Sequence, residues 1–180
     1  SLITTEVSSF QLETTFSLRC DAAAFLNLTQ DHIDWHGSFE AYEAAKHRIF
    51  SDSTIRVLNR DDAFSMKAKD EKKTVYTFGW TEPVEAAQWG VGKEYDVEWL
   101  SFLAPTPVGV KQRRSLLLMD DPVAVTRLIP TQSLKIRGQH NAMNALAALA
   151  LVAAIGIPLP PALKVLTSYC GESHRVQSVL

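Results

Sequence analysis

The sequence predicts an α/β fold with a mixed, mostly parallel sheet, flanked by helices and ended by an antiparallel edge. The apolar run Ala22–Leu28 is typical of a strand buried in a parallel sheet, and a helix that Ser38 can cap follows it. Five of the eight prolines lie within residues 80–130, between short strand-like runs, which indicates antiparallel hairpins. Residues 142–155 are nearly all Ala, Leu and Val, as in a buried helix.

Local patterns predict the other elements of the first half. Leu2–Val7 is expected to form a short strand. Ser8, with Gln11 three residues later, fits a capping box that begins a helix running to about Ser17. The remaining predicted elements are strands at Thr54–Asn59 and Lys73–Phe78 and a short helix near Asp61–Met66.

The second half is predicted to form hairpin strands followed by helices. Gly156 is expected to end the buried helix, and Pro161 to begin another that runs to about Tyr169. The strand-like runs are Tyr95–Leu103, Ser115–Met119 and Val123–Leu128, with the start of a further strand at His174–Leu180.

Composition excludes several classes of protein. A net charge of −2 without a long basic run argues against a nucleic-acid groove. The two cysteines give neither a disulfide framework nor a metal-binding spacing. The longest apolar run, Ala145–Ile155, is too short to cross a bilayer, and no secretion signal opens the chain. We therefore expect a cytoplasmic monomer that binds neither nucleic acid nor membrane.

Polar side chains with metal-ligating groups gather directly after the Ala22–Leu28 strand. In open α/β sheets, ligands bind beyond the carboxyl ends of the strands. Oxygen ligands there would favour Mg²⁺ or Mn²⁺, whereas a site with two imidazoles would favour zinc. A hydrogen-bonded turn is the alternative, with Asp31 and Asp34 accepting from local amides. The side chains concerned are Asn27, Asp31, His32, Asp34 and His36.

Glu6 and Lys46 each have two interpretations. Glu6 is either a second oxygen ligand or a carboxylate facing the N-terminus of the next helix. Lys46 lies roughly 12 Å into the helix after Ser38, on or beside its apolar face. It is either a reactive amine, because burial lowers a lysine pKa, or a lysine that reaches out to solvent.

A further group of residues suits a nucleotide. Asn141 is most simply the N-cap of the buried helix, with Asn144 in its first turn, and the same helix N-terminus could bind phosphate. Arg175 offers a fork of donors for phosphate or ribose. Gly92-Lys93 lacks the spacing of a phosphate-binding loop, so we expect no nucleotide role for it.

Four separated stretches together resemble the Mur ligases, in the order and near the spacing of that family. Within the family, SSFQLE favours the branch that adds D-glutamate to UDP-N-acetylmuramoyl-L-alanine (UDP-MurNAc-L-Ala). Residues 51–134 resemble the family only through VLNRDD and TFG. The four stretches are EVSSFQLE (6–13), LNLTQDHIDWH continuing to YEAAK (26–46), GQHNAMNALAALA (138–150) and GESHRV (171–176).

The resemblance implies an ATP-dependent ligase of peptidoglycan synthesis, hence of cell wall formation, cell shape and cell division. ATP converts a carboxylate to an acyl phosphate, which the amine of D-glutamate attacks. By position, Glu6 and His32 match magnesium ligands, and Lys46 matches a lysine that carries a metal-binding carbamate. Asn141, Asn144 and Arg175 match nucleotide-binding residues, whereas Ser8 and Gln11 lie where the tail of the UDP-sugar is expected.

The chain also departs from the family. It contains no glycine-rich loop ending in Gly-Lys-Ser/Thr, and Gln177 replaces an acidic residue usual in the family. We therefore expect residues 1–180 to be a partial ATP-binding central domain, with 171–180 leading toward a C-terminal domain, and to be inactive alone. The alternatives are another Mur ligase, a folylpolyglutamate synthetase, a metal-dependent hydrolase and a non-catalytic scaffold domain.

Overall fold

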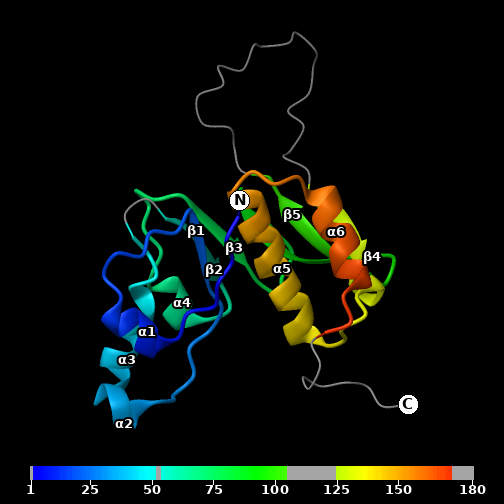
Figure 1. Ribbon diagram of the computed structural model, residues 1–180. Helices are drawn as coiled ribbons and strands as arrows, with labels where there is room; N and C mark the ends of the chain where they lie inside the picture. The colour runs from blue at the N-terminus through cyan, green and yellow to red at the C-terminus, as the bar shows by residue number, and fades with distance from the viewer. Residues whose placement is uncertain (1, 52–53, 105–124, 172–180) are drawn as a thin grey trace.

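One six-stranded sheet runs through the computed structural model, which describes residues 2–51, 54–104 and 125–171 (Figure 1). The strands are β1 (Ala22–Phe25), β2 (Ile55–Asn59), β3 (Val75–Phe78), β4 (Gln88–Glu94), β5 (Val97–Leu103) and β6 (Thr126–Pro130). They lie side by side in chain order. Strands β1 to β4 pair in parallel, whereas β4–β5 and β5–β6 are antiparallel. The predicted fold class is therefore confirmed.

Helices form a layer on each side of the parallel strands. Figure 1 shows α1, α3 and α4 on one side and α5 and α6 on the other. The helices are α1 (Ser9–Thr14), α2 (Ile33–His36), α3 (Phe39–His47), α4 (Ala63–Met66), α5 (Gln139–Ala154) and α6 (Leu159–Ser168), with a 3₁₀ turn, η1 (Thr131–Ser133).

Two apolar clusters fill the space between the sheet and these layers. Successive strand side chains point to opposite faces, so Val57 joins one cluster and Leu58 the other. The α3 cluster consists of Phe25, Leu28, Tyr42, Leu58 and Ala68. The α5 cluster consists of Val57, Phe78, Trp89, Val91, Leu100, Leu134, Ala142, Ala145, Leu146, Ala147, Leu149 and Ala150.

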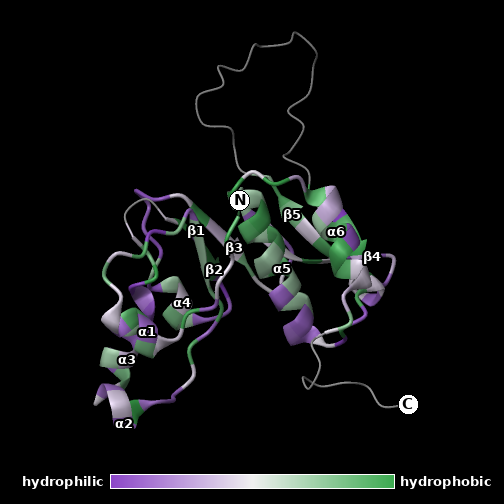
Figure 2. Ribbon diagram, viewed as in Figure 1, coloured by the Kyte–Doolittle hydropathy of each residue, from purple (hydrophilic) through white to green (hydrophobic). Residues whose placement is uncertain are grey.

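Helix α5 is apolar along most of its length and polar at its N-terminal end, as Figure 2 shows. It begins after Gly138, whose φ of 102° favours glycine, and no side chain caps it. The prediction of Asn141 as N-cap is therefore wrong, because the helix begins two residues before it, at Gln139. Gly156, with a φ of 75°, follows the end of the helix as predicted.

Several other boundaries differ from the predictions. Residues 2–7 pair with no described strand, and Leu2 and Ile3 are exposed, so the predicted strand is wrong. Strand propensity reflects packing on a half-buried surface, which this segment lacks. Helix α1 ends at Thr14, and α6 begins at Leu159. The predicted strands at 115–119 and 174–180 lie outside the described residues.

The hairpin region contains one strand that the sequence did not reveal. Strand β4 was missed because Gly90 and Gly92 weaken its strand pattern. Tyr95 and Asp96, both with positive φ, form the turn between β4 and β5, so the predicted strand at Tyr95–Leu103 begins at Val97. No helix in the described part of the chain is long and apolar enough to span a membrane.

Candidate functional site

A pocket of about 510 Å³ lies at the carboxyl end of β1. It brings together Glu6, which precedes α1, Lys46 in the last turn of α3, and Asn144 in α5. These three residues come from segments far apart in the sequence, and each carries a role implied by the family resemblance. The lining is completed by Thr5, Val7, Leu12, Ala24, Phe25, Leu26, Asn27, Ile49, Ala147, Ala148 and Leu151.

The short segments around β1 explain why these groups converge. Ser38 caps α3 through a 3.1 Å bond from the Ala41 amide to its hydroxyl, as predicted. Helix α3 then presents Lys46 one turn after buried Tyr42, so the stem of the lysine lies beside the α3 cluster. On the opposite side, α5 contributes the small side chains of Ala147 and Ala148, which leave space for the pocket.

The polar groups of this pocket have unused hydrogen-bonding capacity. Glu6 and Asn144 are exposed and Lys46 is half-buried. Within residues 2–51, 54–104 and 125–171, none of the three side chains forms a hydrogen bond or an ion pair. A carboxylate, an amine and an amide facing one hollow can bind a ligand without first breaking internal contacts.

His32 lies outside the lining of this pocket. It precedes α2 with a φ of 55°, and its ring packs edge-on against Phe10 at 4.9 Å and Tyr42 at 6.0 Å between ring centroids. Its Nε2 lies 3.4 Å from an oxygen of Asp31, and its side chain is 44% exposed. Glu6 and Lys46 thus share the pocket, and the metal-binding role of His32 stays a prediction.

The second histidine of this region, His36, is engaged elsewhere. Its Nε2 lies 3.0 Å from Ser9 Oγ, and its Nδ1 lies 3.5 Å from Glu13 Oε2. The described residues contain no group of three or more His, Cys, Asp or Glu side chains arranged to hold a metal ion. A two-imidazole zinc site, which the hydrolase alternative requires, therefore has no support here.

The donor set of the pocket fits a hard cation in part. Mg²⁺ prefers oxygen ligands, and the unpaired Glu6 carboxylate is one such group. A lysine ammonium repels a cation, whereas a carbamate on Lys46 would add oxygen ligands in the same hollow. The unmodified residues therefore supply one hard oxygen ligand, and a fit to Mg²⁺ requires the modification of Lys46.

The predicted nucleotide-binding residues differ in their surroundings. Asn141 donates from Nδ2 to the Arg137 carbonyl at 2.7 Å, which ties the start of α5 to the preceding loop. Asn144, three residues on, faces the pocket instead. Arg175 lies outside the described residues.

The predicted substrate-binding residues Ser8 and Gln11 form the capping box of α1. The Gln11 amide donates to Ser8 Oγ at 3.3 Å, and Gln11 Oε1 accepts from the Ser8 amide at 2.8 Å. This confirms the predicted cap. Both residues are exposed, so they remain accessible, and their substrate role stays a prediction.

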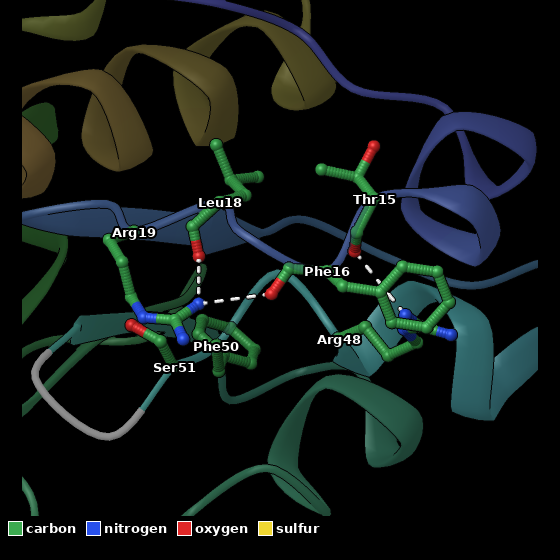
Figure 3. Close-up of a pocket in the computed structure, with 7 residues that line it drawn as sticks. All are labelled: Thr15, Phe16, Leu18, Arg19, Arg48, Phe50 and Ser51. Carbon is green, nitrogen blue, oxygen red and sulfur yellow. Dashed lines mark hydrogen bonds between the residues drawn. The ribbon is translucent and has the colours of Figure 1, made fainter.

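A second hollow, of about 470 Å³, lies beside the loop between α1 and β1 (Figure 3). Arg19 donates to the carbonyls of Phe16 and Leu18 at 3.3 and 2.8 Å. Arg48 donates to the Thr15 carbonyl at 3.3 Å and lies 4.5 Å above the Phe16 ring. Because these contacts hold the loop itself, we assign the hollow no ligand.

Sequence reasoning missed the contributions of small and buried residues. Ala147 and Ala148 belong to a run that predicts only a buried helix, although both line the pocket. The contacts of His36 with Ser9 and Glu13 were also missed. The only signal for them was the i, i+4 spacing of Ser9 and Glu13 in the α1 segment, which puts both on one helix face.

Ligases from two Burkholderia species are similar to nearly the whole chain. These ligases, from Burkholderia ambifaria (strain MC40-6) and Burkholderia vietnamiensis (strain G4 / LMG 22486), are both named UDP-N-acetylmuramoylalanine–D-glutamate ligase. They are 47% and 49% identical over 97% of this chain, which spans 36% and 37% of their length.

Solved structures show the same fold at low identity. The UDP-N-acetylmuramoylalanyl-D-glutamyl-2,6-diaminopimelate–D-alanyl-D-alanyl ligase of Acinetobacter baumannii has a TM-score of 0.56 at 20% identity, covering 89% of this chain and 31% of its own. A pseudomurein peptide ligase type C from Methanothermus fervidus has a TM-score of 0.53 at 16% identity, covering 83% and 34%. The profile of the Mur ligase middle domain matches residues 1–152, and the chain therefore belongs to that family.

Proposed function

We propose that this chain carries the ATP-handling part of a ligase that adds D-glutamate to UDP-MurNAc-L-Ala in peptidoglycan synthesis. The observation that supports this most is the pocket shared by Glu6, Lys46 and Asn144, in a chain 47% identical to a ligase of that name. The proposed compartment is the cytoplasm, where ATP and UDP-linked precursors are found, and the proposed state is a monomer.

The proposed reaction has two steps. A carboxylate oxygen of UDP-MurNAc-L-Ala attacks the γ-phosphorus of ATP, which gives an acyl phosphate and ADP. The amine of D-glutamate then attacks the acyl carbon, loses a proton and expels phosphate, which leaves an amide. Bound Mg²⁺ or Mn²⁺ would neutralise the charge of the phosphoryl group during transfer.

Each predicted site residue has a proposed task in this reaction. Glu6, His32 and a carbamate on Lys46 would hold the metal. The carbamate forms when the neutral Lys46 amine adds to carbon dioxide and releases a proton, and its half-buried stem fixes the new carboxylate in the pocket. The remaining residues are Asn141, Asn144 and Arg175, proposed to bind ATP, and Ser8 and Gln11, proposed to bind the UDP-sugar substrate.

Lys46 provides the sharpest test, in a full-length protein that contains this sequence. Lys46→Arg keeps the charge but cannot form the carbamate, so kcat should fall by about a hundredfold or more, as when an electrostatic transition-state contact is removed. Lys164→Arg, an exposed site on α6, is the matched control and should retain activity. Labelled carbon dioxide should give a carbamate signal in the wild type and the control only. Unchanged turnover by Lys46→Arg would refute the proposed role.

This chain alone should release no phosphate when supplied with both substrates and ATP. It contains no Gly-Lys-Ser/Thr sequence to cradle the phosphates of ATP. Phosphate release that requires UDP-MurNAc-L-Ala and D-glutamate together would contradict this expectation. Replacing D-glutamate by other amino acids in the full-length protein separates the proposed ligase from sibling ligases on the same scaffold.

A further inference from the structure

His36 is the residue at which α1, α2 and α3 meet. It is the last residue of α2, and its side chain is only 1% exposed. The ring lies between Phe10 of α1, with centroids 5.6 Å apart and planes at 22°, and Tyr42 of α3, at 5.3 Å and 37°. An imidazole buried in this way requires hydrogen-bond partners for its nitrogens.

Both nitrogens have a partner on α1. Nε2 lies 3.0 Å from Ser9 Oγ, and Nδ1 lies 3.5 Å from Glu13 Oε2. The Ser9 hydroxyl either donates to Nε2 or accepts from it, according to the tautomer, and the Glu13 carboxylate forms an ion pair with the ring when the imidazole is protonated. Glu13 also accepts from Trp35 Nε1 at 3.0 Å. Helix α2 therefore holds α1 near both of its ends.

The order of serine, imidazole and carboxylate resembles the triad of serine hydrolases. A nucleophile must reach its substrate, however, and Ser9 is 2% exposed and lines neither of the two pockets described above. The same geometry is well suited to holding two helices in a fixed position.

Helix α1 depends on such contacts because it has only six residues, and a helix of that length is not stable in isolation. It carries the capping pair Ser8 and Gln11, and Glu6 lies just before it. His32 packs on the same two rings, Phe10 and Tyr42, that enclose His36. A shift of the His36 ring would therefore be transmitted to both sides of the proposed site.

We propose that His36 is a positioning residue, which uses Ser9 and Glu13 to fix α1 and thereby aligns the UDP-sugar contacts with His32. This inference rests on the proposed ligase function for its kinetic consequence. The structural consequence, the fixing of α1, is independent of that function. The two consequences can be measured separately.

The kinetic experiment compares His36→Phe with His47→Phe in the full-length protein. Phe retains the ring stacking and loses both polar contacts, so the KM for UDP-MurNAc-L-Ala should rise about tenfold, while the KM for ATP should stay within about twofold. His47 is the matched control on the same helical layer, because its Nε2 contacts the Phe64 carbonyl at 3.1 Å rather than α1. An equal rise of both KM values in both variants would overturn the proposal.

Hydrogen exchange provides the readout that needs no activity. In His36→Phe, the amides of α1 should exchange at least about tenfold faster, while those of β1 to β3 stay protected. Ser9→Ala is the milder variant, to be used for the same measurement if His36→Phe does not fold. Glu13→Gln retains an acceptor and should behave as the wild type, whereas Glu13→Leu should not. Unchanged exchange in α1 would overturn the proposal even if the protein is the proposed ligase. Absence of D-glutamate addition by the wild type would instead refute the proposed function.

Discussion

The two helical layers of this protein are held to the sheet in different ways. The layer of α5 packs on the sheet through a large apolar cluster, with Leu146 and Ala150 at 0% exposure. The opposite layer combines the smaller α3 cluster with hydrogen bonds between distant segments. For example, the Ser65 hydroxyl donates to the Phe25 carbonyl at 2.7 Å. The first arrangement provides stability, whereas the second fixes the direction of particular side chains, and the proposed metal and UDP-sugar contacts lie on that side.

The largest expected effect is in the α5 layer. Leu146→Ala should lower the free energy of unfolding by about 2–5 kcal/mol, because it leaves a cavity in a close-packed core. Val165→Ala, at a position 62% exposed on α6, is the control and should change it by less than about 0.5 kcal/mol. Urea unfolding measures both. Similar losses at the two sites would mean that the α5 cluster is not the main core.

The second-largest loss of stability is expected in the opposite layer, where a buried hydroxyl forms hydrogen bonds with the backbone. Ser65 is fully buried, and besides its bond to Phe25 it accepts from the Asn59 amide at 2.9 Å. Ser65→Ala leaves both backbone groups unpaired and should cost about 1–3 kcal/mol. Ser168→Ala, at the exposed end of α6, is the control. Equal unfolding midpoints for the two variants would argue against a polar framework on this side.

A smaller loss of folding stability is expected when the cap at the start of α3 is removed. Ser38→Ala removes the hydroxyl that accepts from the Ala41 amide and should cost about 1 kcal/mol. Ser38→Asp supplies another capping oxygen and should restore the stability. Thermal unfolding distinguishes the two variants, and a destabilised Ser38→Asp would show that capping is not the reason.

The smallest effect concerns the titration of Tyr42. Burial raises the pKa of this phenol above its usual value, and the Asp31 carboxylate adds to the rise. The stabilisation of the neutral phenol is therefore complete below the unfolded pKa of about 10 and is lost as pH rises through the higher folded pKa. Asp31→Asn should lower the pKa of Tyr42 slightly, as measured by tyrosinate absorbance with Tyr42→Phe as reference. An equal shift in Asp34→Asn would contradict the assignment to Asp31.

Local signals predicted much of the fold but only part of the site. The caps at Ser8 and Ser38 and the β-branched apolar run of β2 were predictable, since each depends on residues a few positions apart. Strand β4 was not, because its glycines are tolerated only through pairing with β3 and β5. The positions of the site residues also depend on contacts between distant segments. The family resemblance placed Glu6, His32 and Lys46 together, whereas the structure puts only two of them in the pocket lining.

The sequence by itself determined the fold class and the helix caps at Ser8 and Ser38, because periodicity and capping act over one or two turns of chain. The candidate site residues came from the resemblance to the family. The tertiary structure alone decided that Glu6, Lys46 and Asn144 face one pocket, and that His36 is enclosed by Phe10 and Tyr42. Those contacts join segments as far apart in the chain as residues 6 and 144, and their geometry is set by how the layers pack on the sheet.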